Sequence, residues 1–369
     1  MTRRAFAIAA LLMSLYVASG SVASGFSQTG GRPAEAGRYG LPNRLTNSEF
    51  WTLMTSMSEP DGNFRSDNLV SNEIKFQWVI PELLRRVRPG GVYLGVGPEQ
   101  NFTYIAALKS KVAFIVDLRR GNTDLHLMYK ALFELSADRA DFVSKLLSRP
   151  RPDGLTATSS AADIFAAFAT VDPSERMLNA TLASVRNQLT TIRRFPLAAD
   201  DLMRIEAIAR VFLLAGTKIQ YSPYGSFGGT TQPTYAELMA AADEMGEPRS
   251  FLANEPTFLF IKDMEQRNVL VPLVADFAGP KTLRAIGDYA RRRGATISAF
   301  YVSNVEEYLQ GPASRAFCAN VSSLPLAADS VFIRAVRGDT LNAAVEGFVN
   351  QLAPMLDETR RCGGRIPQR

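Results

Sequence analysis

Histidine and cysteine are scarce in this chain of 369 residues, which contains one His and two Cys. A structural zinc site needs about four nitrogen or sulfur ligands close together. The single histidine, His126, lies far along the chain from Cys318 and Cys362. The sequence therefore predicts no metal site. Two cysteines fit one disulfide in an oxidising compartment, and two unpaired thiols fit the sequence equally well.

The motifs of several common enzymes are missing as well. The chain has no Gly-x-Ser-x-Gly elbow, no phosphate loop ending in Gly-Lys-Ser/Thr and no paired-histidine motif. Charge of one sign is not in large excess, because 41 basic and 36 acidic residues give a net charge of +5. Basic residues such as Arg85, Arg86 and Arg120 lie at the ends of expected helices, where they complement the helix dipole. We expect neither a hydrolase nor a nucleotide triphosphatase, and no nucleic-acid partner.

The chain has no apolar run long enough to span a bilayer, which takes roughly 20 residues. Its longest candidate, AIAALLMSLYVA, follows Arg3 and Arg4 and ends at Ala18. A basic start, a short apolar run and small residues near Ser24 are typical of a secretory signal peptide. Thr-Arg-Arg-Ala-Phe also loosely resembles a twin-arginine signal. We expect a signal peptide over residues 1–24, an exported protein that is periplasmic or secreted, and no stable membrane insertion after cleavage.

Beyond the signal, the hydrophobic pattern predicts one α/β domain over residues 46–357. Residues 25–45 are rich in Gly and Pro and are expected to form a linker, and residues 358–369 a polar tail. Apolar strands expected at 92–96, 112–117, 268–279, 295–304 and 331–336, with a shorter one at 218–221, are interspersed with helices expected at 74–87, 101–109, 123–135, 280–292 and 341–356. Such alternation predicts a doubly wound, mostly parallel sheet. Between about 137 and 215 only helices are expected, as a helical insertion.

A glycine-rich loop follows the first of these strands. Gly95 and Gly97 permit close approach of a ligand to the backbone, and Pro98, Glu99, Gln100 and Asn101 lead into a helix whose free amides favour an anion. A tight turn that only lets strand and helix pack together is the other interpretation of this loop.

An acidic residue, Asp117, ends the second strand 20 residues beyond Gly97. From this position a carboxylate accepts hydrogen bonds from ribose hydroxyls. The loop and the aspartate together resemble class I S-adenosylmethionine-dependent methyltransferases, which implies a Rossmann-like, methyltransferase-like fold. The resemblance also implies that S-adenosylmethionine binds along the loop, with its ribose on Asp117 and Arg119 beside it.

The resemblance covers about residues 74–136 and 268–337, and it is incomplete. Class I methyltransferases usually have an acidic residue in place of Gly95, and glycines in place of Glu99 and Asn101. The strings FIVDLRRGN, VPLVADFAGPK and FYVSNVEEYL are also similar to a bacterial family of methyltransferase-like proteins, a likeness that implies a fold and no particular reaction.

Polar residues follow the other strands. Asp276 is a candidate substrate-orienting group or general base if burial raises its pKa, or else a cap of the following turn. Ser303 and Asn304 are expected to bind substrate or to cap the next helix. His126 is expected in the first turn of the helix after Asp117, as a general base or as a packing residue.

Two functional hypotheses remain from the sequence. In the first, the protein is methyltransferase-like and binds a small molecule, S-adenosylmethionine or a related adenosine-containing ligand, at the strand-end crevice, where in-line methyl transfer needs mainly positioning. In the second, it is an exported scaffold that lacks the cofactor and binds an envelope component or partner through its helical insertion. Export favours the second, because S-adenosylmethionine is expected to stay in the cytoplasm. Ser71 to Glu73 and Tyr221 to Tyr224 are candidate covers of the crevice or simply caps and turns.

Overall fold

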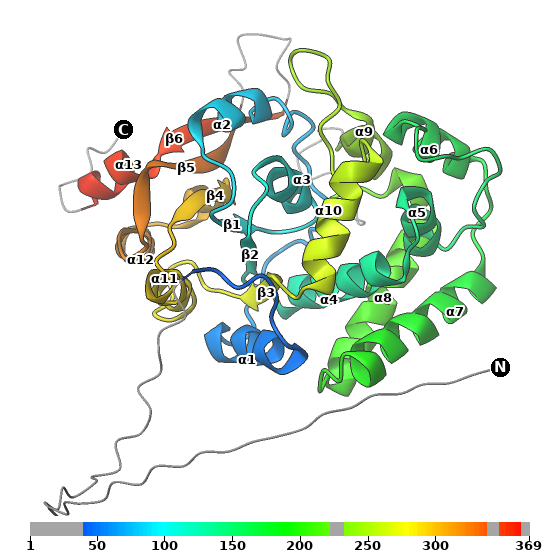
Figure 1. Ribbon diagram of the computed structural model, residues 1–369, viewed down its shortest axis with the longest axis horizontal. Helices are drawn as coiled ribbons and strands as arrows, with labels where there is room; N and C mark the ends of the chain where they lie inside the picture. The colour runs from blue at the N-terminus through cyan, green and yellow to red at the C-terminus, as the bar shows by residue number, and fades with distance from the viewer. Residues whose placement is uncertain (1–39, 222–231, 338–346, 363–369) are drawn as a thin grey trace, which may run out of the picture. The chain divides into compact units, whose positions relative to one another are not determined.

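The structure of the protein is a computed structural model that describes residues 40–221, 232–337 and 347–362 (Figure 1). The expected signal peptide lies outside the described residues. The described residues form one compact unit. Among the described residues, none of the helices has the length and apolar character needed to cross a membrane.

A six-stranded sheet forms the centre of this unit, which is therefore an α/β fold. The strands lie in the order β3-β2-β1-β4-β5-β6. The first five are parallel, and β6 is antiparallel to β5. Their bounds are β1 (Val92–Val96), β2 (Val112–Asp117), β3 (Leu270–Val274), β4 (Ile297–Ser303), β5 (Leu326–Arg337) and β6 (Phe348–Pro354). Every residue of β2 and β3 is buried, as expected of parallel strands covered on both faces.

Helices cover both faces of the sheet (Figure 1). One layer contains α2 (Ile80–Arg86), α3 (Gln100–Ala107), α4 (Arg120–Leu135) and α10 (Glu255–Gln266). The other contains α1 (Asn47–Met57), α11 (Thr282–Arg292) and α12 (Pro312–Ser322), while α13 (Met355–Arg361) packs against β5. The helices that connect β1 to β3 lie on one face of the sheet, and those that connect β3 to β5 lie on the other. Right-handed crossovers require this change of face where the strand order reverses.

The helical insertion is confirmed. Between residues 137 and 215 lie α5 (Arg139–Leu147), α6 (Ala161–Ala169), α7 (Glu175–Arg186), the π-helix η1 (Asn187–Ile192) and α8 (Ala199–Ala215), followed by the short 3₁₀ helix η2 (Gly216–Lys218) and by α9 (Tyr235–Ala240). Of these, α5, α7, η1 and α8 pack against the outer side of α4, so that α4 is buried from Asn122 to Phe133. Polar residues of α4 are therefore buried with its apolar stripe. Some of them form ion pairs, such as Asp124 with Arg204 of α8 at 2.5 Å.

The expected helix at 341–356 is wrong over its described part up to Pro354, and only Met355 and Leu356 are helical, as the start of α13. Residues 348–354 form β6, which pairs with β5 from Val331 to Arg337. Without β6 the backbone of β5 would present an unpaired edge. Tertiary pairing of this kind overrides local propensity. The expected helix at 74–87 is also too long, since α2 begins only at Ile80, and the expected strand at 218–221 reduces to a single bridge between Gln220 and Thr234.

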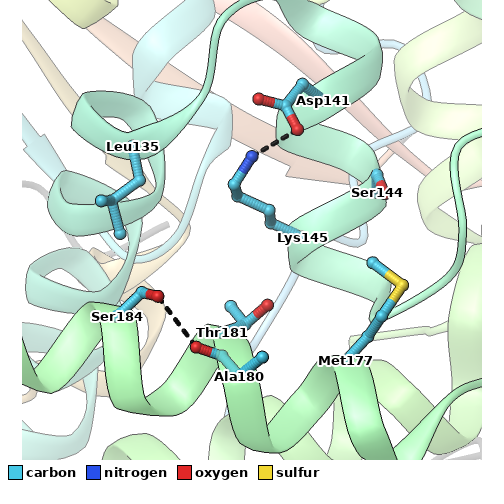
Figure 2. A pocket seen from close by; sticks show the side chains of 8 residues that line it. All are labelled: Leu135, Asp141, Ser144, Lys145, Met177, Ala180, Thr181 and Ser184. Atoms are coloured by element: carbon cyan, nitrogen blue, oxygen red, sulfur yellow. Dashed lines mark hydrogen bonds and ion pairs between the residues drawn. The ribbon is translucent and has the colours of Figure 1, made fainter.

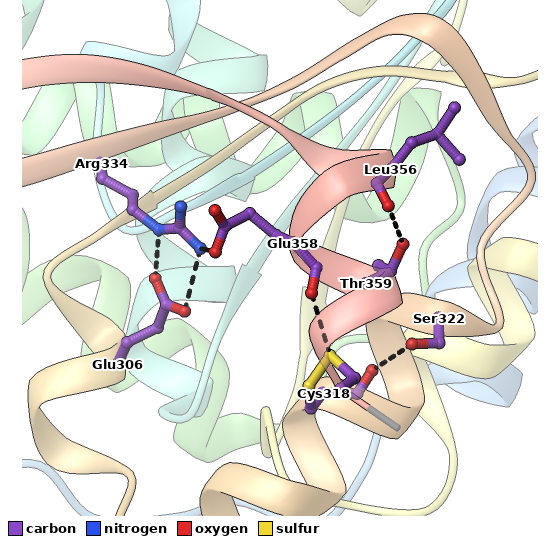
Figure 3. The surroundings of a disulfide bond; sticks show 8 residues. Glu306, Cys318, Ser322, Arg334, Leu356, Glu358 and Thr359 are labelled. Atoms are coloured by element: carbon purple, nitrogen blue, oxygen red, sulfur yellow. Dashed lines mark hydrogen bonds and ion pairs between the residues drawn. A yellow bond between two sulfur atoms is a disulfide. The ribbon is translucent and has the colours of Figure 1, made fainter. Parts of the chain in front are cut away.

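The folded domain extends further toward both ends of the chain than the sequence indicated. Leu45, in the expected linker, is buried, and its amide donates to the Arg267 carbonyl at 2.9 Å. In the expected tail, Cys362 forms a disulfide with Cys318 of α12, with a Cα–Cα distance of 5.6 Å (Figure 3). Arg334 of β5 lies beside this bond and pairs with Glu306 at 2.5 Å.

Candidate functional site

The carboxyl ends of β1, β2 and β4 meet at the point where the strand order reverses. Gly95 of β1 is in register with Ile115 of β2 on one side and with Tyr301 of β4 on the other. Just beyond β1, the Gly97 amide donates to the Val116 carbonyl at 3.2 Å. Open α/β sheets bind their ligands at such a reversal point. The glycine loop and Asp117 therefore terminate neighbouring parallel strands, as the sequence predicted.

The two glycines of the loop have different surroundings. A Cβ added at Gly95 would lie 1.9 Å from Asn101 Oδ1 and 2.7 Å from the Tyr93 hydroxyl, so its close approach is to its own chain. Gly97 is buried and has a φ of +79°, yet an added Cβ there would meet nothing within 4 Å. Room for an added carbon atom therefore adjoins Gly97 and not Gly95.

Asn101 holds the loop together. Its Nδ2 donates to the carbonyls of Pro98 at 2.7 Å and Val96 at 2.9 Å, and its Oδ1 accepts from the Tyr93 hydroxyl at 2.8 Å. Since these bonds use both ends of its carboxamide, Asn101 acts as a brace for the loop.

Asp117 is engaged by Arg119. The backbone N–H and Nε of Arg119 donate to Asp117 Oδ1 at 2.9 and 3.0 Å, and Nη2 donates to Oδ2 at 3.1 Å. The two side chains are 7% and 11% exposed. Arg119 also donates to the Asp67 carbonyl from a preceding loop. Asp117, which the sequence predicted to bind a ribose, thus forms a largely buried, bidentate ion pair with Arg119.

A second carboxylate, Glu73, lies at the centre of the β4 side of the site. It is 1% exposed. Its Oε1 accepts from the Tyr301 hydroxyl at 2.7 Å and from Ser303 Oγ at 2.5 Å. Its Oε2 accepts from Gln100 Nε2 at 2.8 Å and from Asn350 Nδ2 at 2.7 Å. This carboxylate joins α3, β4 and β6 and is fully hydrogen-bonded.

Glu99 and Gln100 begin α3 beside this network. Gln100 Oε1 accepts a hydrogen bond from the Ser71 hydroxyl, and Gln100 Nε2 donates to the Tyr104 hydroxyl at 3.0 Å. Glu99 is fully buried, and its Oε1 accepts only the Ser71 amide, at 3.2 Å. Its Oε2 has no hydrogen-bond partner among the described residues. Burial raises the pKa of Glu99 to about 8, so the carboxyl is largely neutral at pH 7.

His126 lies beneath the glycine loop, in the second turn of α4. It is 1% exposed, and its Nε2 donates to the Gly97 carbonyl at 2.9 Å. Its Nδ1 has no partner among the described residues. Burial lowers the pKa of His126 to about 4, so the imidazole is neutral at pH 7. The side chain braces the loop and presents one free acceptor.

The remaining predicted residues have mainly local contacts. Asp276 is exposed, and its Oδ1 accepts the Ala278 amide at 2.9 Å, which is the turn-capping arrangement. The burial that a general base needs at this position is missing. Asn304 donates to Glu307 at 3.1 Å and makes no cap bond to the short 3₁₀ helix η4 (Val305–Tyr308). Ser303 has a positive φ of 50° and binds Glu73, so it belongs to the polar network.

A loop from Glu59 to Asn68 crosses the strand ends. Glu59 accepts the Asp276 amide at 2.7 Å beyond β3, and Gly62 donates to the Leu118 carbonyl at 2.9 Å beyond β2. Phe64 packs edge-on against Tyr308 beyond β4, with ring centroids 5.3 Å apart. This loop covers much of the edge at which the sequence predicted an open crevice.

A family model described as a domain of unknown function, DUF7790, matches residues 68–195 and 215–357, more than half of the chain. The chain belongs to this family. No curated protein matches it. The matched segments include β1 to β6 and the polar residues at their carboxyl ends, and they leave out most of α8.

The helical insertion has a separate hollow of about 220 Å³ between α5 and α7 (Figure 2). Asp141 and Lys145 form an ion pair at its rim, and Met177 and Ala180 line the opposite side. No residue of the sheet edge lines it. Within the described part of the chain, no group of three or more His, Cys, Asp and Glu side chains could hold a metal ion.

Sequence reasoning missed several residues of the site. Tyr301 and Asn350 carried no signal, because each lies inside an apolar or ordinary segment. Glu73 had a weak one, as a carboxylate in a polar loop, and was interpreted as part of a cap or cover.

Proposed function

We propose that the protein binds a small adenosine-containing ligand, with S-adenosylmethionine as the leading candidate, where β1, β2 and β4 end. The surroundings of Gly97 carry this proposal. Gly97 is buried at the reversal point of the sheet and has a φ of +79°, and apart from its two chain neighbours no described residue comes within 4 Å of the position that a Cβ would occupy. A glycine in this position lets a ligand approach the backbone.

The strand order supports a Rossmann-like assignment, since dinucleotide-binding folds share the order found here. Asp117 retains some capacity for a ribose. It accepts three hydrogen bonds from Arg119, two at Oδ1 and one at Oδ2. A carboxylate has about four acceptor sites. One ribose hydroxyl can therefore donate to Oδ2 while the ion pair stays intact.

The chemistry of methyl transfer would come from the sulfonium of S-adenosylmethionine, and the protein would mainly bind and orient. Glu99 is protonated at pH 7, His126 is a buried imidazole made weakly basic because burial lowers its pKa to about 4, and Asp276 is exposed in a turn. These groups favour a binding role over a general-base role. We therefore propose ligand binding as the function and methyl transfer only as the reaction such binding would permit.

Two observations favour the second hypothesis, a scaffold that lacks the cofactor. Asp117 is already paired with Arg119, and the loop from Glu59 to Asn68 covers the strand ends. In this case the described site would be a set of internal contacts, and partners would bind elsewhere.

Thermal shift and calorimetry with S-adenosylmethionine and S-adenosylhomocysteine test the proposal. A ligand at 100 times its dissociation constant adds about 2.7 kcal/mol of stability. Gly97→Ala would fill the space and abolish the shift. Gly154→Ala is the matched control, because Gly154 has a φ of +80° and equally open surroundings but lies on the surface of the insertion. A wild-type protein that responds to neither ligand would eliminate the adenosine proposal and leave the scaffold hypothesis.

A further inference from the structure

Four buried polar side chains lie behind the glycine loop, and we call them the inner polar cluster: Glu99, His126, Tyr129 and Tyr235. None is more than 1% exposed. Each has one polar atom without a hydrogen-bond partner among the described residues, namely Glu99 Oε2, His126 Nδ1 and the two phenolic hydroxyls. The cluster therefore has unused hydrogen-bonding capacity at four points.

The four side chains come from three different elements and face a common region. His126 and Tyr129 lie one turn apart on α4, with ring centroids 6.0 Å apart. Tyr129 and Tyr235 both pack edge-on against Phe212, at 6.3 and 6.4 Å. Burial raises the pKa of both tyrosines, and the nearby Glu99 carboxyl raises each further. His126 joins the region to the ligand space, because it donates to the Gly97 carbonyl at 2.9 Å.

Unpaired polar atoms in such a place are unusual. Each buried donor or acceptor without a partner costs about 1–3 kcal/mol. The neighbouring Glu73 carboxylate, at the same sheet edge, accepts hydrogen bonds from four side chains. The chain thus satisfies one buried carboxyl fully and leaves another, Glu99, half satisfied. Buried atoms elsewhere in the described residues, such as the Tyr289 hydroxyl and both carboxylate oxygens of Glu265, also lack hydrogen-bond partners, so the grouping of four such side chains is what distinguishes the cluster.

The cluster also defines the chemistry of that partner. His126 donates from Nε2, so its Nδ1 is an acceptor. The two phenols and the protonated Glu99 can donate, and each can also accept. No cation belongs to the cluster, and a buried charge without a counter-ion is costly. Phosphate and carboxylate groups therefore do not match it.

We propose that the inner polar cluster recognises an uncharged ligand group that both donates and accepts hydrogen bonds, such as a nucleobase edge or a carboxamide. This inference rests on the proposed function for the location of the ligand beside Gly97, and it specifies which part of the ligand enters. An adenine edge satisfies both requirements.

Removing one hydroxyl at a time tests the proposal without creating a cavity or a charge. We choose Tyr129→Phe and Tyr235→Phe. Because these hydroxyls lack partners in the described residues, neither substitution should destabilise the free protein. Tyr289→Phe is the matched control, since Tyr289 is also buried with an unpartnered hydroxyl but lies on α11, on the opposite face of the sheet.

The probes are adenine and nicotinamide as uncharged groups, acetate and phosphate as anions, and S-adenosylhomocysteine as the larger ligand, all measured by thermal shift and calorimetry. We expect at least one uncharged probe to stabilise the wild type and Tyr289→Phe, and to bind at least tenfold more weakly to Tyr129→Phe and Tyr235→Phe. The anions should give no shift.

Two outcomes overturn the inference. One is that no uncharged probe stabilises the wild type, which would mean that the cluster binds only ordered water. The other is equal binding to all three tyrosine variants. Failure of the proposed function would look different: nicotinamide would bind in a tyrosine-dependent way while adenine and S-adenosylhomocysteine gave no shift.

Discussion

The ion pair between Asp117 and Arg119 has an unusually well-matched counterpart on the surface. In both pairs one carboxylate oxygen accepts the arginine backbone N–H and Nε, and the other accepts Nη2. The distances are 2.9, 3.0 and 3.1 Å for Asp117 with Arg119. They are 3.2, 2.8 and 3.3 Å for Asp329 with Arg88. The two pairs therefore share hydrogen-bond geometry and differ mainly in burial.

Burial predicts very different effects when each aspartate is changed to asparagine. The side chains of Asp117 and Arg119 are 7% and 11% exposed, whereas those of Asp329 and Arg88 are 23% and 83% exposed. Removing one partner of a buried pair costs about 3–5 kcal/mol, because a charge is left without compensation. Arg119 keeps its bond to the Asp67 carbonyl, so we expect the lower end of that range for Asp117→Asn. Water screens the exposed pair, and Asp329→Asn should be close to wild type.

Urea unfolding at pH 7, with the slope of the transition checked for each variant, measures this difference. An intact slope shows that the native and unfolded states keep their compactness, so that a change in midpoint reports stability. Raising the salt concentration should alter the free energy of unfolding for the Asp117 pair less than for the Asp329 pair. Equal losses of stability for the two asparagine variants would refute the argument that burial determines the strength of these pairs.

Two further predictions concern stability. Reducing the disulfide, or changing Cys318 and Cys362 to Ser, should lower the free energy of unfolding by about 4 kcal/mol in the chain-entropy model, since the bond joins residues 44 positions apart; an unchanged melting temperature with reductant would contradict this. Burial raises the pKa of Glu99 from 4.5 to about 8, so its contribution to stability is fully present below pH 4.5 and is lost as the pH rises through 8. Glu99→Gln should therefore flatten the fall in stability between pH 5 and 8 in a urea series. Burial likewise raises the pKa of Glu265 to about 8, so the part of the fall in stability that is due to Glu265 should remain in the Glu99→Gln variant. A fall in stability as steep as that of the wild type would show that Glu99 does not titrate in this range.

Much of the fold could be predicted because parallel α/β folds have a strong sequence signal. The strands VYLGV and VAFIVD are almost wholly apolar, and the structure buries them on both faces. The insertion was predictable as helices, since long periodic segments with polar caps are distinctive. The antiparallel strand β6 was not, because its residues alternate weakly and its structure depends on pairing with β5.

The site could be predicted only where the chain positions a residue locally. Gly97 and Asp117 could be located because Gly97 directly follows β1 and Asp117 is the last residue of β2. The partner of Asp117 was harder to foresee, although Arg119 lies two residues away, since a ribose and a guanidinium satisfy the same carboxylate. Glu73 binds Asn350, 277 residues further along the chain, and no local pattern encodes such a contact.

The two functional hypotheses predict different uses for the four unpaired polar atoms behind the glycine loop. A scaffold gains nothing from leaving four buried atoms of Glu99, His126, Tyr129 and Tyr235 without partners. At about 1–3 kcal/mol each, their combined cost is comparable to the net stability of a typical domain, roughly 5–15 kcal/mol. A binding protein recovers this cost when its ligand supplies the missing hydrogen bonds, and positions that are unfavourable in the free state often mark such sites. If Tyr129→Phe and Tyr235→Phe stabilise the free protein and weaken ligand binding, the strand-end edge is a binding site. The unpartnered hydroxyls, which destabilise the free protein, would then be the groups that bind the ligand.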